Sequence, residues 1–276
     1  MTILVGIRCK DGVVIGADSS VTFGADQFHR TIEQFTDKKI EIIGDQVIVA
    51  GTGAVGHQQR FCSVVDKVFK TNDVFGKMSA LEIACHLANK GVSDFASTHS
   101  PVKQYAALVA YRSNDRKINL CEFTLDGFQP EMKELKGLWW ASLGSGQAIV
   151  DPFLALLSKV FWYDGAPSLK GGIFTASWAL DHACELNTGG IQPPIRIATL
   201  QADRLDKGKI RARMLSDDEL SEHRDMIGEA TKRLQSFREV LEGEGTVESK
   251  DIPQPKPAVA TAPLPGLPGG PPLTKL

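Results

Sequence analysis

Thr2 carries the side chain in this sequence that is best placed for chemistry. It follows Met1 directly, and Thr is small enough for the initiator Met to be removed routinely. Removal leaves a hydroxyl and an α-amine on one residue. A Thr hydroxyl is a weak nucleophile until a base takes its proton, and an adjacent N-terminal amine can act as that base. The alternative is that Thr2 is merely the residue after Met1.

The strands that follow must position a partner for Thr2. The apolar run of residues 2–7 indicates a strand from the start of the chain, so we expect no targeting segment or propeptide. Asp11-Gly12 is a tight-turn signal, and residues 13–18 indicate a returning strand. This turn sets Val5 opposite Asp18, roughly 10 Å along the strand from Thr2. Pairing parity puts Thr2 and Asp18 on opposite faces, so a bulge or a bridging side chain is needed.

A lysine from the next predicted strand, residues 38–43, can supply that bridge. Strand alternation groups Lys38 with the apolar face and places Lys39 on the polar face. An inward-pointing cation is costly unless a carboxylate pairs with it. We therefore predict that Lys38 pairs with Asp18 and that Lys39 is a solvated surface residue.

Residues 2–18 resemble the opening of a proteasome β-subunit or of its bacterial relative HslV. Three later segments resemble segments of the same family in the same order: Gly51-Thr52-Gly53-Ala54, Ser142-Leu143-Gly144-Ser145-Gly146 and Asn187-Thr188-Gly189-Gly190. The similarity extends over roughly residues 2 to 200. The longer loop and the C-terminal extension favour one of the bacterial proteasome homologues over HslV itself.

The resemblance assigns roles to residues of this chain. It implies a catalytic centre of Thr2, Asp18 and Lys38, with the Gly53 amide facing the substrate carbonyl and Ser145 nearby. Glu185 and Thr188 stand where the family generally has Asp and Ser, and the resemblance gives them a supporting role. The stretch between Asp18 and the lysines is longer than usual, and its residues 24–36 are a candidate lining for a substrate channel or pore.

The remaining pattern predicts a four-layer fold. Helices are expected near 54–70, 79–97, 147–161 and 170–187, with strands at 46–50, 105–112, 117–123, 139–142 and 195–200. Strand groups separated by helix pairs indicate two packed sheets between helical layers, an α/β/β/α sandwich. This α/β (α+β) class agrees with the N-terminal-nucleophile hydrolase fold that the resemblance implies.

The C-terminal part predicts a separate helix and a tail. Ser216-Asp217-Asp218-Glu219 is a capping box, and apolar residues recur at intervals of three and four up to Leu241. This helix either docks on its own domain or contacts a neighbouring subunit. Beyond about Glu244 the chain is rich in Pro, Gly and Ala, which predicts a flexible tail. The expected divisions are a catalytic domain at 1–215, a helix at 216–243 and a disordered tail at 244–276.

Composition narrows the class of protein. The net charge of -2 gives no basic patch for nucleic acid or an anionic membrane, and the apolar runs are too short to span a bilayer. The five cysteines are scattered singly along the sequence, a pattern typical of proteins in a reducing cytoplasm. Neither the cysteines nor the histidines show the spacing of metal ligands. We expect a cytoplasmic protein without a metal or organic cofactor.

Gly51-Thr52-Gly53-Ala54-Val55-Gly56 also matches the GxGxxG fingerprint of dinucleotide-binding proteins. That fold needs a second parallel strand after the helix. Here a second helix is predicted instead, which argues against a nucleotide site.

The resulting hypothesis is a homo-oligomeric threonine endopeptidase that cleaves unfolded proteins or peptides. By analogy with the family, its subunits stack as double rings, and an unfolding ATPase is a further candidate partner. Two alternatives stay open: an N-terminal-nucleophile amidase acting on a small molecule, and a catalytically silent ring subunit.

Overall fold

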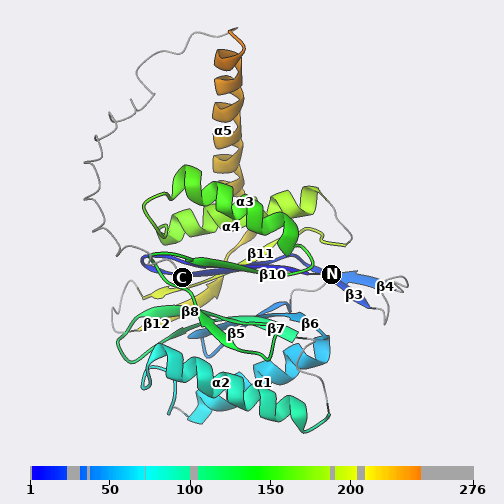
Figure 1. The fold of residues 1–276 in the computed structure, drawn as a ribbon, viewed down its shortest axis with the longest axis vertical. Coiled ribbons are helices and arrows are strands. Elements are labelled where there is room, and N and C mark those ends of the chain that lie inside the picture. The colour runs from blue at the N-terminus through cyan, green and yellow to red at the C-terminus, as the bar shows by residue number, and fades with distance from the viewer. Residues whose placement is uncertain are drawn as a thin grey trace, which may run out of the picture. The chain divides into compact units, whose positions relative to one another are not determined.

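The computed structural model describes residues 2–23, 32–35, 38–71, 73–99, 105–186, 190–203 and 209–243. The chain divides into two units, Met1–Thr231 and Lys232–Leu276. The first unit contains two sheets between two pairs of helices (Figure 1). One pair is α1 (Val55–Thr71) and α2 (Ala80–Ala96), and the other is α3 (Gln147–Phe161) and α4 (Leu169–Glu185). The predicted α/β/β/α sandwich is confirmed.

Each of the two large sheets has five antiparallel strands. The first has the order β10-β1-β2-β11-β12, with bounds Trp140–Gly144, Ile3–Arg8, Gly12–Ala17, Arg196–Ala202 and Ile210–Met214. The second has the order β5-β6-β7-β8-β9, with bounds Ile40–Ile43, Val47–Gly53, Tyr105–Arg112, Ile118–Phe123 and Pro130–Met132. A separate hairpin pairs β3 (Ser20–Phe23) with β4 (Ile32–Phe35).

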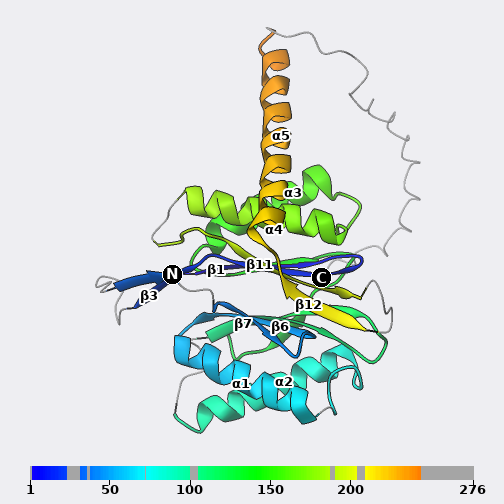
Figure 2. The same cartoon turned by 180° about the vertical axis from the view of Figure 1, so that it is seen from behind.

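The layering explains why the strands are almost continuously apolar. Every residue of β1 and β2 is buried, because each sheet is covered on both faces. Ile3, Val5 and Ile7 pack toward α3 and α4, whereas Leu4 packs between the two sheets. The second sheet packs its other face against α1 and α2 through a cluster rich in aromatic rings. Figure 2, seen from behind, shows the same succession of layers.

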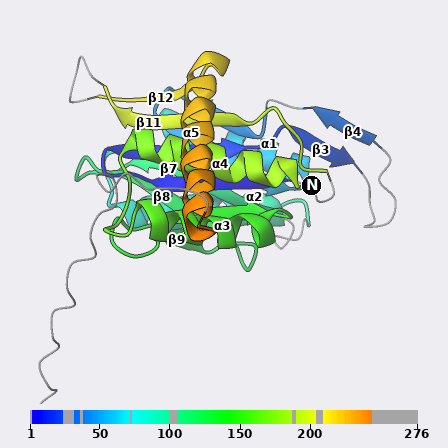
Figure 3. The same cartoon turned by 90° about the horizontal axis from the view of Figure 1, so that it is seen from above.

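Helices α2 and α4 begin within one residue of their predicted starts at 79 and 170. Ser79 caps α2 in a capping box, with its side chain accepting from Glu82 N and Glu82 accepting from Ser79 N. Ser168 caps α4 by accepting from Gly171 N. Figure 3 looks down onto α3 and α4, which lie over the first sheet.

The register of the first hairpin differs from the prediction. Val5 lies opposite Gly16 rather than Asp18, and the Cys9 N–H donates to the Gly12 carbonyl at 2.8 Å. Gly12 therefore belongs to β2, and the loop is formed by Lys10 and Asp11. The glycine serves close packing instead of the turn, since a Cβ at Gly12 would lie 2.6 Å from the Leu200 carbonyl of β11. The shift brings Asp18 opposite Ile3, next to Thr2.

The sequence also left some elements unpredicted. Strands β9 and β12 and the hairpin β3–β4 were not expected, while α5 (Asp217–Leu241) matches the predicted C-terminal helix. Part of the expected channel-lining loop falls on β4, and its residues 24–31 and 36 lie outside the described residues, as does the predicted tail at 244–276. Strand β6, which carries the GxGxxG segment, pairs antiparallel with both neighbours. The parallel βαβ unit of a dinucleotide site is therefore not formed there.

Candidate active site

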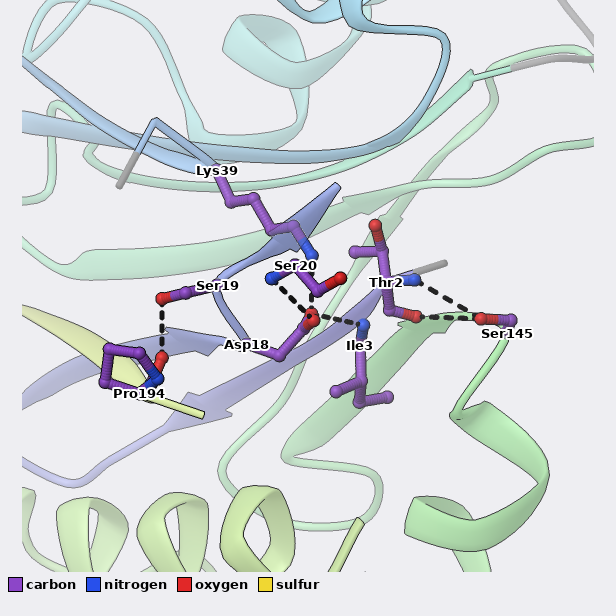
Figure 4. A network of polar contacts seen from close by, with 8 residues as sticks. All are labelled: Thr2, Ile3, Asp18, Ser19, Ser20, Lys39, Ser145 and Pro194. Atoms are coloured by element: carbon purple, nitrogen blue, oxygen red, sulfur yellow. Dashed lines mark hydrogen bonds and ion pairs between the residues drawn. The ribbon is translucent and has the colours of Figure 1, made fainter. Parts of the chain in front are cut away.

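Thr2 lies at the start of β1, where it meets the end of β10. The Thr2 N–H donates to the Ser145 hydroxyl at 3.3 Å, and this hydroxyl donates to the Thr2 carbonyl at 3.4 Å. The Gly146 N–H also donates to the Thr2 carbonyl, at 3.4 Å. Ser145 therefore holds both the nitrogen and the carbonyl of Thr2, as Figure 4 shows.

Close approach of β10 to Thr2 depends on Gly144. Gly144 has a φ of +104°, and a Cβ there would lie 2.2 Å from the Thr2 carbonyl oxygen and 3.3 Å from Thr52 Oγ1. A side chain at this position would displace the backbone of Thr2. The glycine thus lets β10 of one sheet, the end of β6 in the other, and Thr2 meet at one point.

Asp18 is the buried carboxylate beside Thr2. Its Oδ1 accepts the Ile3 N–H at 2.9 Å and the Lys39 ammonium at 2.6 Å, and its Oδ2 accepts the Ser20 N–H at 3.1 Å. The carboxylate side chain has no exposed surface. Asp18 therefore fixes the peptide that follows Thr2 and receives a cation from the other sheet (Figure 4).

The predicted pair between Lys38 and Asp18 is wrong, because Lys39 makes this contact. Lys39 is 6% exposed, whereas the Lys38 side chain is exposed. Both lysines lie in a turn, and β5 begins only at Ile40. Strand alternation, on which the prediction was based, does not apply before the strand begins.

Burial and the Asp18 carboxylate shift the pKa of Lys39 in opposite directions. Burial lowers the pKa of the Lys39 ammonium, and the nearby Asp18 carboxylate offsets part of this effect. Cys184 at the end of α4 lies close enough for the Asp18 charge to matter: burial, and then Asp18, raise the pKa of the Cys184 thiol to about 12. A thiol with this pKa stays protonated near neutral pH. Cys184 stands alone in the sequence, which gave no signal of its position.

A cavity of about 1000 Å³ adjoins these residues. Thr2 and Lys39 both line it, together with Gly51, Thr52 and Gly53 at the end of β6. Gly53 is exposed and has a φ of +114°, a conformation that favours glycine. The structure thus brings Thr2, Asp18, Lys39, Gly53 and Ser145 together at one end of the sandwich.

Of the two predicted supporting residues, Glu185 is not joined to this group. Glu185 is exposed at the end of α4, and among the described residues no hydrogen bond or ion pair links it to Thr2, Asp18 or Lys39. Thr188 lies outside the described residues. The segment after it contributes differently: the Ser19 N–H donates to the Gln192 carbonyl at 3.2 Å, and the Ser19 hydroxyl donates to the Pro194 carbonyl at 2.5 Å.

The described residues contain no group of three or more His, Cys, Asp and Glu side chains that could hold a metal ion. All five cysteines lie in the described part of the chain, and each is a free thiol. Within the same part, no helix is long and apolar enough to cross a bilayer.

Comparison with known proteins places this site in context. Residues 2–154 match the family model described as "Proteasome subunit". A proteasome subunit beta of Nanoarchaeum equitans is 28% identical over 86 residues, 30% of this chain and 41% of that relative. The match therefore spans less than half the length of the relative.

Two solved structures share the fold. The Anbu (Gly-1) mutant from Hyphomicrobium sp. strain MC1 superposes with a TM-score of 0.62 at 13% identity, covering 86% of this chain and 97% of that one. Anbu (ancestral beta-subunit) from Yersinia bercovieri gives a TM-score of 0.61 at 15% identity, covering 84% and 95%. At these identities the likeness concerns the fold alone.

The buried ion pair predicts the stability of Asp18 variants. Asp18→Ala leaves the Lys39 ammonium buried without its partner, so we expect a loss of about 3 kcal/mol or more in the free energy of unfolding. Adding Lys39→Met should recover part of this loss, because the unpaired charge is then gone. Urea unfolding at a fixed protein concentration measures both. The adjacent Lys38→Ala is the matched control, with an expected change within about 0.5 kcal/mol. A loss below about 1 kcal/mol for Asp18→Ala would contradict the role given to the pair.

Proposed function

Because the chain belongs to the proteasome subunit family, we propose that it is a threonine endopeptidase whose nucleophile is Thr2 after removal of Met1. The observation that carries the proposal is the buried Lys39–Asp18 pair, 2.6 Å between Nζ and Oδ1, whose Lys39 lines the same cavity as Thr2. A cation held beside a hydroxyl and an α-amine is the arrangement that activates an N-terminal nucleophile.

The first step is attack on a peptide carbonyl. The Thr2 α-amine accepts the proton of the Thr2 hydroxyl while Oγ1 bonds to the carbonyl carbon. The Lys39 charge lowers the pKa of the α-amine, so more of it is unprotonated, and favours the developing alkoxide. Asp18 acts through Lys39 by fixing its position and favouring its charged form. Ser145, 3.3 Å from the Thr2 nitrogen, orients the amine.

The second step releases the amine product and regenerates the enzyme. The attack of the first step leaves an oxyanion on the former carbonyl, and the Gly53 N–H is its proposed hydrogen-bond donor. The protonated α-amine gives its proton to the departing nitrogen, and the acyl group remains as an ester on Thr2. Water then attacks this ester with the α-amine as base, which yields a carboxylate and restores the hydroxyl. Each proton removed is returned, and no cofactor is required.

The edge of β6 supports a peptide over a small molecule as the substrate. Strand β5 pairs with β6 only from Val47 to Ala50, so residues 51–53 extend beyond β5 along the cavity. An extended peptide can add to such an edge through main-chain hydrogen bonds, which bind without regard to sequence. A small amide has no use for this length of backbone.

Ring-like self-assembly is part of the proposal, on the basis of the family. In such an assembly the active sites face an enclosed space, and the substrates are unfolded chains or peptides that can enter it. An unfolding ATPase as a partner rests on the same analogy.

Replacing the nucleophile tests the proposal. Thr2→Ala removes the attacking oxygen and should abolish hydrolysis of fluorogenic peptides, a loss of at least about 10³-fold. Thr124→Ala, the same change in the turn after β8, should hydrolyse them at the unmodified rate. Size-exclusion chromatography of both variants checks that assembly is unchanged. Residual hydrolysis by an intact Thr2→Ala assembly would exclude Thr2 as the nucleophile.

The lowered pKa of Lys39 predicts an alkaline limit to activity. Its charge is present below its pKa in the folded enzyme and is lost as the pH rises through that value. Because burial lowers this pKa, kcat/KM should fall before the ordinary Lys value of about 10.4 is reached. At the acid side, activity should rise as the α-amine loses its proton, at or below about pH 8.

A pH profile of kcat/KM measures both limits. Lys38→Gln is the control and should keep the alkaline limb, since Lys38 is exposed and makes no contact with Asp18. Activity that persists undiminished to about pH 10.4 would show that a buried, charged Lys39 is not needed.

A further inference from the structure

Glu41 places a carboxylate on the cavity that Thr2 lines. It lies on β5 opposite Val49, whose side chain packs on the α1 and α2 side of the sheet. Glu41 is half-buried. Among the described residues, no ion pair joins Glu41 to a Lys, Arg or His side chain. A carboxylate on a cavity wall that no protein cation neutralises can pair with a cationic group of a ligand.

The protein neighbours of Glu41 are neutral polar groups. Its carboxylate interacts with the Cys62 thiol: burial, the negative charge of Glu41 and a hydrogen bond to it raise the pKa of that thiol. Gln58 Nε2 donates to Cys62 Sγ at 3.3 Å, and the buried Tyr105 hydroxyl donates to Gln58 Oε1 at 2.5 Å. The three residues behind Glu41 thus form a chain of hydrogen bonds that does not cancel its charge.

Gly51 makes room for this chain. A Cβ at Gly51 would lie 1.9 Å from Gln58 Oε1 and 2.4 Å from the Tyr105 hydroxyl. Because Gly51 has no side chain, Gln58 and Tyr105 can form their hydrogen bond next to β6. Gly51 and Gln58 both line the cavity. The polar wall is therefore a built feature of the cavity, with fixed side-chain positions.

The other charges on the cavity are arranged differently. Lys39 is committed to Asp18 at 2.6 Å, and Asp66 pairs with Lys70 at 2.6 Å. Lys38 also lines the cavity and is exposed. Glu41 therefore differs from these residues, because no described residue neutralises its half-buried charge.

We propose that Glu41 selects substrates with Lys or Arg as the residue whose carbonyl Thr2 attacks. The inference rests on the proposed function and adds its substrate class. The side chain of that residue is attached next to the attacked carbon, so it enters the cavity that Thr2, Thr52, Glu41 and Cys62 line together. A cavity of about 1000 Å³ accommodates a long side chain. Its cationic end meets the Glu41 carboxylate in a charge-assisted hydrogen bond.

Fluorogenic peptides that differ only in this residue test the inference. We expect the unmodified enzyme to hydrolyse the Arg and Lys peptides with kcat/KM at least about tenfold above that for the Leu peptide. Glu41→Gln should reduce this ratio about tenfold or more, and Glu41→Asp, which keeps the charge, should retain most of the preference. Glu222→Gln removes an equal charge from the exposed surface of α5 and should leave the ratio unchanged. Because the readout is a ratio within one preparation, partial loss of folded enzyme does not alter it.

The outcomes separate this inference from the function on which it rests. Thr2-dependent hydrolysis of the Leu peptide with a ratio that Glu41→Gln does not change would overturn the role of Glu41 and leave the peptidase standing. A preference for a Glu peptide, as Lys38 and Lys39 would favour, would overturn it as well. If no peptide is cleaved and Thr2 takes up no covalent inhibitor, both proposals fall.

Discussion

The buried ion pair of Lys39 and Asp18 is the interaction on which the rest of this structure depends. Moving either charge out of water costs several kcal/mol, and a buried pair offsets this cost only when further hydrogen bonds satisfy its groups. Asp18 meets this condition with the Lys39 ammonium and the N–H groups of Ile3 and Ser20. The pair therefore ties the start of β1 and the end of β2 to the turn before β5, which belongs to the opposite sheet. Thr2 inherits its position from this connection.

Close backbone approach completes what the ion pair begins. Gly144 allows β10 to lie against Thr2, and Gly51 allows the polar groups beneath β6 to meet. Between them the end of β6 runs past β5 and forms one wall of the cavity. The same end of the sandwich thus holds a hydroxyl, a cation, an open strand edge and a carboxylate, Glu41, that forms no ion pair with any described residue. A peptide substrate has a use for each of these, so the proposed peptidase activity and the proposed preference for a basic residue draw on one arrangement.

Much of this arrangement could be predicted from the sequence, and the failures have physical causes. The alternation of strand groups with helix pairs along the sequence indicated the four layers. Thr2 and Asp18 were identified, but their spacing was wrong, since Gly12 serves contact with β11 and not the turn. Lys38 was chosen over Lys39 by strand alternation that does not extend into the preceding turn. The role of Glu41 had no sequence signal, because it depends on which charges remain unpaired after folding.

The proposed function requires Thr2 to become an N-terminal nucleophile. Intact mass spectrometry after incubation with a peptide epoxyketone tests it most directly, since this group forms its stable ring only with a hydroxyl and an unblocked amine on one residue. We expect a chain that has lost Met1 and gained one inhibitor, with no gain in Thr2→Ala. A chain that retains Met1 and gains no inhibitor would contradict it.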